Sequence, residues 1–209
     1  MIIAIDGPAA AGKGTLARRI AAALGLPYLD TGLLYRAVGR RVLDSGADPA
    51  NPEAATTAAR SLTEADFQRT DLRGPEADKA ASQVASIPAV RAALLQFQRH
   101  YGATIGAVLD GRDIGTIIFP NADVKLFVTA SLEARTQRRY AEILGRGEAV
   151  SLEDVRADLA ARDEADRTRT AAPLVQAADA TLLDTSAMDA DAAFAKALAL
   201  VQAKAAPRL

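Results

Sequence analysis

A glycine-rich segment near the start of the chain has the residue types and spacing of a phosphate-binding loop. Gly7, Gly12 and Lys13 follow the pattern Gly-x-x-x-x-Gly-Lys directly after an apolar run. Consecutive backbone N–H groups and a helix start present positive potential to phosphate oxygens, and glycines let the backbone approach closely. A lysine in this register can reach the outer phosphates of a nucleoside triphosphate. The residues expected to bind this nucleoside triphosphate are Gly7, Pro8, Ala9, Ala10, Ala11, Gly12, Lys13, Gly14 and Thr15.

The position of the loop hydroxyl narrows the class of protein. Residue 14 is Gly, and the hydroxyl comes one position later at Thr15, an order typical of nucleoside monophosphate kinases. A signalling GTPase would also need a guanine-reading Asn-Lys-x-Asp segment, and the sequence contains none. The loop therefore favours a small kinase.

Phosphoryl transfer between two nucleotides requires many positive charges, so arginines should converge on the site from several segments. Arg112 and Asp113 follow an apolar run, at the carboxyl end of a strand where open α/β sheets bind ligands. Arg36 stands about one helical turn beyond Thr31, and both could meet a phosphate. Three more arginines share i, i+3 and i+4 spacing after a possible cap at residue 131, and we expect phosphate to be their partner: Arg135, Arg138 and Arg139.

A second charged helix is expected to begin after Ser151, which with Asp154 forms a capping-box pattern. An apolar stripe on this helix continues at intervals of three and four into charged residues: Leu152, Val155, Leu159, Arg162, Asp166 and Arg169. Arginines on the inward stripe of a helix need an anion or a carboxylate to face. The alternative is a helix end that extends past the protein body into water.

Strands and helices alternate along most of the chain, which predicts an α/β fold with a parallel sheet. The five expected strands cover 2–5, 28–30, 106–110, 124–129 and 180–184. We therefore expect a P-loop kinase fold with a five-stranded parallel sheet flanked by helices. The predicted core comprises 1–44, 84–134 and 170–209, with a monophosphate-binding insertion at 45–83 and a short lid at 135–169. One short strand is expected near Phe67, inside the insertion.

Composition excludes several classes of site. The 209 residues carry a formal net charge of -1, which argues against bulk binding to nucleic acid or to an anionic membrane. There is no cysteine and a single histidine, so thiolate chemistry and multi-histidine metal sites are excluded, and we expect His100 at the surface. No basic leader and no uncharged apolar run of about 18 residues is present, which indicates a cytoplasmic protein, and we expect a monomer.

Several segments together resemble the bacterial cytidylate kinase family, whose members phosphorylate CMP and dCMP. The resemblance spans nearly the whole chain in order, and the Asp-Gly-Arg-Asp and Ala-Ser-Gln-Val-Ala segments separate this family from adenylate and thymidylate kinases. The matching segments cover 5–8, 12–15, 30–36, 81–85, 90–91, 110–116, 119–120 and 162–169.

The resemblance implies roles for individual residues, with ATP and Mg²⁺ at the donor end. It implies that a lid over ATP begins with Arg135, Arg138 and Arg139. It also implies four catalytic residues that stabilise the negative charge of the phosphoryl group during transfer: Lys13, Arg112, Arg139 and Arg169. It implies these contacts to the substrate: phosphate to Thr31, Arg36, Arg112 and Arg169, cytosine to Ser82, Arg91 and Asp113, and sugar to Arg162 and Asp166. No protein metal ligand and no strong general base is implied, since the acceptor is already an anionic phosphate.

The sequence departs from the family pattern in the loop and in the insertion. Ala9 and Ala10 stand where Ser-Gly is more usual, and alanine suits these positions if the backbone there is right-handed. The insertion before Ser82 is shorter than the family's usual small-sheet insertion. Two alternatives stay open: a P-loop kinase of another small acceptor such as UMP or shikimate, and a nucleotide-binding switch without a second substrate.

Overall fold

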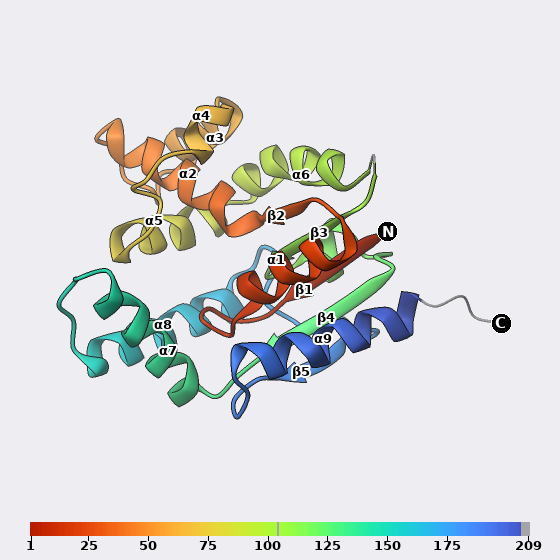
Figure 1. Ribbon diagram of the computed structural model, residues 1–209. Coiled ribbons are helices and arrows are strands. Elements are labelled where there is room, and N and C mark those ends of the chain that lie inside the picture. The colour runs from red at the N-terminus through yellow and green to blue at the C-terminus, as the bar shows by residue number, and fades with distance from the viewer. Residues whose placement is uncertain (104, 206–209) are drawn as a thin grey trace.

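The computed structural model describes residues 1–103 and 105–205, so the last four residues of the predicted core segment 170–209 lie outside the described residues. Five parallel strands form a central sheet in the order β2-β3-β1-β4-β5 (Figure 1). The strands are β1 (Ile2–Asp6), β2 (Tyr28–Asp30), β3 (Ala107–Gly111), β4 (Val124–Thr129) and β5 (Thr181–Asp184). Every pairing between neighbours is parallel, which confirms the predicted five-stranded parallel sheet.

Helices cover both faces of the sheet because successive strand residues point in opposite directions. Ile3 and Ile5 of β1 pack against α1 (Lys13–Leu24) and α9 (Ala190–Ala205) on one face. Ala4, between them, faces the core formed with α6 (Pro88–Ala103) and the short turn η1 (Ile114–Ile118). Because apolar side chains are needed on both faces, β1 is a continuous apolar run as far as Asp6.

A separate helical group follows β2 and lies above the sheet in Figure 1. It contains α2 (Thr31–Asp44), α3 (Pro52–Arg60), α4 (Glu64–Phe67) and α5 (Pro75–Ala85). Val38 and Val42 of α2 share one buried cluster with Val84 of α5 and several alanines. The small side chains let these helices pack closely, and this packing holds α5 beside the sheet.

The prediction of a short strand near Phe67 is wrong, because this residue ends the one-turn helix α4. The Asp66 carboxylate accepts a hydrogen bond from the backbone N–H of Thr63 at 2.7 Å, which fixes the start of the turn. His100 is exposed on α6, as expected. Over the described residues, no helix combines the length and the apolar character that crossing a membrane requires.

Two further helices, α7 (Leu132–Gly145) and α8 (Leu152–Thr168), form the lower left part of the molecule in Figure 1. Ile143 of α7 packs against Val155 and Leu159 of α8, as the apolar half of the predicted stripe requires. The predicted domain boundaries at 83–84 and 134–135 fall inside α5 and α7. The division into core, insertion and lid stays a prediction.

Candidate functional site

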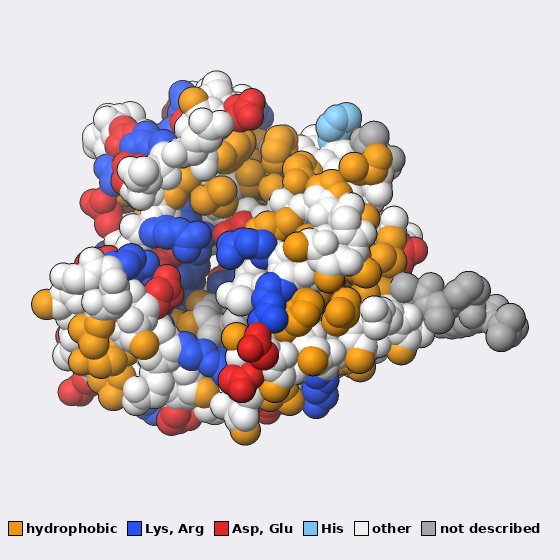
Figure 2. All heavy atoms as spheres, in the orientation of Figure 1, with side chains coloured by type: hydrophobic (Ala, Val, Ile, Leu, Met, Phe, Trp, Pro, Cys, Tyr) orange, Lys and Arg blue, Asp and Glu red, His pale blue; other side chains and the backbone are white. Residues whose placement is uncertain are grey.

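A hollow of about 350 Å³ separates the helical group α2–α5 from α7 and α8. Lys and Arg side chains gather around it in Figure 2. Nine cationic side chains and six carboxylates line this cavity, so an anionic ligand would balance its charge. All of the predicted substrate residues line it: Thr31, Arg36, Ser82, Arg91, Arg112, Asp113, Arg162, Asp166 and Arg169.

The phosphate loop forms one end of the cavity, at the start of α1. Ala9, Ala10 and residues 12–15 line the cavity, whereas Gly7, Pro8 and Ala11 do not. Gly12 has a φ of 88°, a left-handed conformation that favours glycine and turns the chain into the helix. The start of α1 therefore points its unpaired N–H groups toward the region where phosphates would bind.

Lys13 is buried in the loop, where its Nζ donates a hydrogen bond to the carbonyl of Pro8 at 2.9 Å. Burial, together with the nearby Arg112 guanidinium, lowers the pKa of the Lys13 ammonium to about 7. A phosphate beside this ammonium would favour the charged form. The loop therefore holds a lysine whose charge depends on what occupies the site.

The backbone at Ala10 differs from the expectation of a right-handed conformation. Its φ is 58°, one of two positive φ values found at non-glycine residues in the described part of the chain. A left-handed conformation costs an alanine about 1 kcal/mol. The loop accepts this strain to give its backbone the curvature of an anion-binding nest.

Two buried carboxylates connect the phosphate loop to the strand ends beside it. Asp6 accepts hydrogen bonds from the N–H groups of Ile114 and Gly115, at 2.8 and 2.7 Å. Burial raises the pKa of Asp6 to about 6, although these hydrogen bonds oppose the shift. Burial and the neighbouring Asp30 raise the pKa of Asp110 to about 6 as well. Asp6 thereby fixes the segment that follows Asp113 relative to the phosphate loop.

The other end of the cavity is formed by β3, α2, α5 and α6, which bring distant segments together. Arg91 of α6 forms an ion pair with Asp113, and Thr31 donates a hydrogen bond to the backbone carbonyl of Asp110 at 2.7 Å. Ser82 of α5 lines the same cavity. Residues more than 50 positions apart thus form one polar surface.

Arg112, Asp166 and Arg169 form a second group within the cavity. The Arg112 Nε lies 2.7 Å from an Asp166 carboxylate oxygen, and the other oxygen lies 3.5 Å from Arg169 Nη1. Although Asp166 is buried, the charge of Arg112 and its hydrogen bond hold the pKa of Asp166 below its usual range. The buried Arg169 Nη2 has no hydrogen-bond partner among the described residues, and an anion in the cavity would provide one.

The three arginines of α7 do not share one partner. Arg139 lines the cavity, but Arg138 donates hydrogen bonds to the carbonyls of Thr185 and Met188, outside it. The expectation of a phosphate partner is therefore wrong for Arg138, because the chain after β5 already occupies its guanidinium. Arg135 is buried and does not line the cavity: it pairs with Asp163 and donates to the carbonyl of Ala9 at 3.3 Å.

Four carboxylates in the cavity received no role from the sequence alone: Asp30, Asp78, Asp110 and Glu142. Asp30 and Asp110 stand at the carboxyl ends of β2 and β3, a position that could have indicated them. Asp78 precedes Ser82 by four residues, so both lie on one face of α5. This spacing was the only signal for Asp78, within an alanine-rich helix.

The residues at the donor end fit a nucleotide carrying magnesium. The hydroxyl of Thr15 and the carboxylates of Asp30 and Asp110 line the cavity, and oxygen donors of this kind suit Mg²⁺. Within the described residues, no group of three acidic, histidine or cysteine side chains is arranged to hold a metal ion. The nucleotide phosphates would therefore have to supply most of the ion's ligands.

Comparisons with known proteins agree with this geometry. A family model described as cytidylate kinase matches residues 3–203. The chain is 69% identical over 201 residues to the cytidylate kinase of Acidiphilium cryptum (strain JF-5), which covers 96% of this chain and 95% of that protein. It is 62% identical over 204 residues to the cytidylate kinase of Granulibacter bethesdensis, covering 98% of both. A solved structure, an uncharacterized protein from Eubacterium ventriosum, has a TM-score of 0.58 at 16% identity over 97% of this chain and 98% of that chain, which shows likeness of fold alone.

Proposed function

Because the chain belongs to the cytidylate kinase family, we propose that it transfers the terminal phosphate of ATP to CMP or dCMP, giving ADP and CDP or dCDP. One observation carries the proposal. A single cavity contains the phosphate loop at one end and every residue predicted for the acceptor at the other. A donor and an acceptor bound at these ends would place their phosphates among the arginines between them.

At the donor end, Ala9, Ala10 and residues 12–15 hold the ATP phosphates with backbone N–H groups and the Lys13 ammonium. Arg135 supports the loop through the carbonyl of Ala9 and begins the lid, 135–169. Thr15, Asp30 and Asp110 line this end and would face a Mg²⁺ ion carried by the nucleotide, which would neutralise part of the charge of the donor phosphates.

At the acceptor end, the proposed cytosine reader is the ion pair of Arg91 and Asp113, together with Ser82. Asp113 accepts a hydrogen bond from the exocyclic amine of cytosine, a group that uracil lacks. Arg162 and Asp166 contact the sugar, and the insertion, 45–83, closes over it. The monophosphate is held by a set of four residues: Thr31, Arg36, Arg112 and Arg169.

The transfer itself needs positioning and charge stabilisation more than proton chemistry. The attacking oxygen belongs to a phosphate that is already anionic, so no strong general base is required. Lys13, Arg112, Arg139 and Arg169 stabilise the negative charge that spreads over the transferred group. Since ATP and nucleoside monophosphates are cytoplasmic metabolites, we place the reaction there, in a monomer that binds no nucleic acid.

An assay of ADP formation with CMP, dCMP, UMP and AMP tests the proposal. We expect rapid ADP formation with CMP or dCMP and slow formation with UMP and AMP. Equal rates with UMP would support a kinase of broader pyrimidine range instead. ADP formation that is independent of any monophosphate would support a nucleotide-hydrolysing switch and would contradict the proposal.

The role of Asp113 gives a sharper prediction. Asp113→Ala should lower the ratio of kcat/KM for CMP over UMP roughly 10- to 100-fold, the loss of one hydrogen bond to a charged group. The KM for ATP should change little, because Asp113 lies at the acceptor end. If Asp113→Ala lowers kcat/KM for CMP and for UMP by the same factor, the residue supports the whole site and does not read the base.

A further inference from the structure

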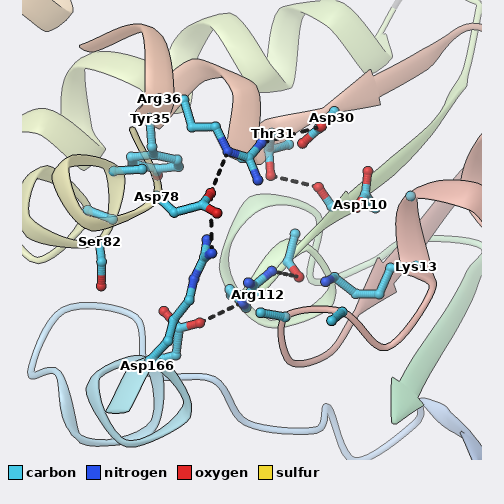
Figure 3. A pocket seen from close by; sticks show the side chains of 18 of the residues that line it. Lys13, Asp30, Thr31, Tyr35, Arg36, Asp78, Ser82, Asp110, Arg112 and Asp166 are labelled. Atoms are coloured by element: carbon cyan, nitrogen blue, oxygen red, sulfur yellow. Dashed lines mark hydrogen bonds and ion pairs between the residues drawn. The ribbon is translucent and has the colours of Figure 1, made fainter. Parts of the chain in front are cut away.

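Asp78 of α5 contacts arginines from three other elements inside the cavity. Figure 3 shows its contact with Arg36. One carboxylate oxygen lies 3.0 Å from the Nε of Arg36 on α2 and 3.3 Å from an Nη of Arg162 on α8. The other oxygen lies 2.6 Å from an Nη of Arg139 on α7. The Asp78 side chain is only 16% exposed, so these contacts are partly shielded from water.

The three guanidinium groups need an anion at this point. Each is close to 20% exposed, and three like charges in a partly buried space repel one another strongly. Burial disfavours the charged form of Asp78, yet the charges of Arg162, Arg36 and Arg139 outweigh this and hold its pKa below the usual range. Asp78 is therefore an ionised partner for all three arginines.

These arginines are also groups that the proposed function assigns to the substrates. Arg36 is assigned to the acceptor phosphate, Arg139 to the transferred phosphate and Arg162 to the sugar. Each guanidinium contacts Asp78 through one carboxylate oxygen, and an anionic phosphate oxygen accepts the same kind of charge-assisted hydrogen bond. Asp78 thus offers the arginines the interaction that a substrate phosphate would offer them.

We infer that Asp78 is an internal counter-ion that competes with the substrate phosphates for these substrate-binding arginines and that bound substrate displaces. The inference rests on the proposed function for the identity of the phosphate. Displacement means that part of each arginine–phosphate interaction replaces an existing interaction. Asp78 therefore weakens substrate binding, and the transfer step proceeds after the carboxylate has left the arginines.

A different role would have the opposite consequence. If Asp78 kept its contacts during the reaction and only oriented the guanidinium groups, its removal would misplace them. Substrate binding would then weaken, and the rate of transfer would fall. The direction of the change in KM therefore distinguishes a displaced counter-ion from a permanent support.

The test uses Asp78→Asn, which removes the charge and keeps the shape. Glu76→Gln is the matched control, because Glu76 is on the same helix, pairs with Arg40 and lies outside the cavity. We expect Asp78→Asn to lower the KM for CMP about fivefold and to leave kcat within about twofold. Glu76→Gln should change neither constant. A raised or unchanged KM, or a large loss of kcat, in Asp78→Asn would overturn the inference.

A second readout does not depend on catalysis. Inorganic phosphate, titrated during thermal unfolding, should stabilise Asp78→Asn at concentrations about fivefold lower than it stabilises the wild-type and control proteins. If the same phosphate concentration stabilises the wild-type protein, Glu76→Gln and Asp78→Asn to the same extent, the inference is overturned, even if the kinase assay shows CMP phosphorylation. If the wild-type protein forms no CDP, the proposed function fails, while the phosphate titration still decides the role of Asp78. Asp78→Ala provides the same comparison if the asparagine variant does not fold.

Discussion

The contact between α2 and α5 gives a stability prediction that the structure makes quantitative. At Gly39 of α2, an added Cβ would lie 2.8 Å from the Cβ of Ala80 and 3.0 Å from its carbonyl carbon. Ordinary contacts between carbon atoms are about 3.5–4.0 Å. Gly39→Ala would therefore force the two helices apart by most of an ångström, because backbone atoms of α5 cannot rotate away.

Two opposing terms determine the size of the effect. Forcing an extra methyl group into a packed interface costs about 1–3 kcal/mol. Replacing a glycine inside a helix with alanine stabilises the helix by about 1 kcal/mol. We therefore expect Gly39→Ala to lower the free energy of unfolding by about 1 kcal/mol. Because α5 carries Asp78 and Ser82 into the cavity, its displacement should also raise the KM for the acceptor, roughly tenfold.

Urea unfolding and steady-state kinetics measure both effects. Gly145→Ala is a suitable control, because Gly145 ends α7 and a Cβ there meets no atom of the described residues within 4 Å. The control should be as stable as the wild-type protein or slightly more stable, with unchanged kinetics. A Gly39→Ala variant that matches this control in stability and in KM would refute the reasoning.

Two further predictions follow from buried ionisable groups. Folded Asp6, with its pKa raised from 3.8 to about 6, keeps its proton to a higher pH than the unfolded chain does, so its contribution to the free energy of unfolding falls as pH rises from about 4 through 6. Asp6→Asn should remove part of this slope in urea unfolding between pH 4.5 and 7, and an unchanged slope would contradict the assignment. Since the pKa of Lys13 is lowered to about 7, ATP binding at pH 7.5 should take up protons, measured by titration calorimetry in buffers of different ionisation enthalpy. Lys13→Met should abolish this proton uptake. If the variant still takes up protons when it binds ATP, a group other than Lys13 accepts them and the prediction is wrong.

The sequence predicted the sheet and the cavity well because both depend on local patterns. Continuous apolar runs that end in Asp6 and Asp110 fit strands buried on both faces, and the parallel sheet then brings their carboxyl ends to one edge. The glycines and lysine of the phosphate loop require a strand before them and a helix after them. The family resemblance, and not these local patterns, supplied Ser82, Arg91 and the roles of the other acceptor residues, which the structure places in the same cavity.

Contacts between distant segments limited the prediction elsewhere. The guanidinium of Arg138 bonds to carbonyls after β5, and helical spacing alone cannot reveal such a partner. The capping interaction at Asp66 determined the structure near Phe67 more strongly than its β-forming aromatic side chain. Asp78 became a candidate only when α2, α7 and α8 were seen to converge on it.

The fate of the terminal phosphate of ATP tests the central claim most directly. The protein is supplied with ATP labelled at the γ-phosphate and with unlabelled CMP, and the labelled products are separated. The proposed reaction places the label in the β-phosphate of CDP, in equal amount to the ADP formed. Label found in inorganic phosphate, with no labelled CDP, would contradict transfer to a cytosine monophosphate.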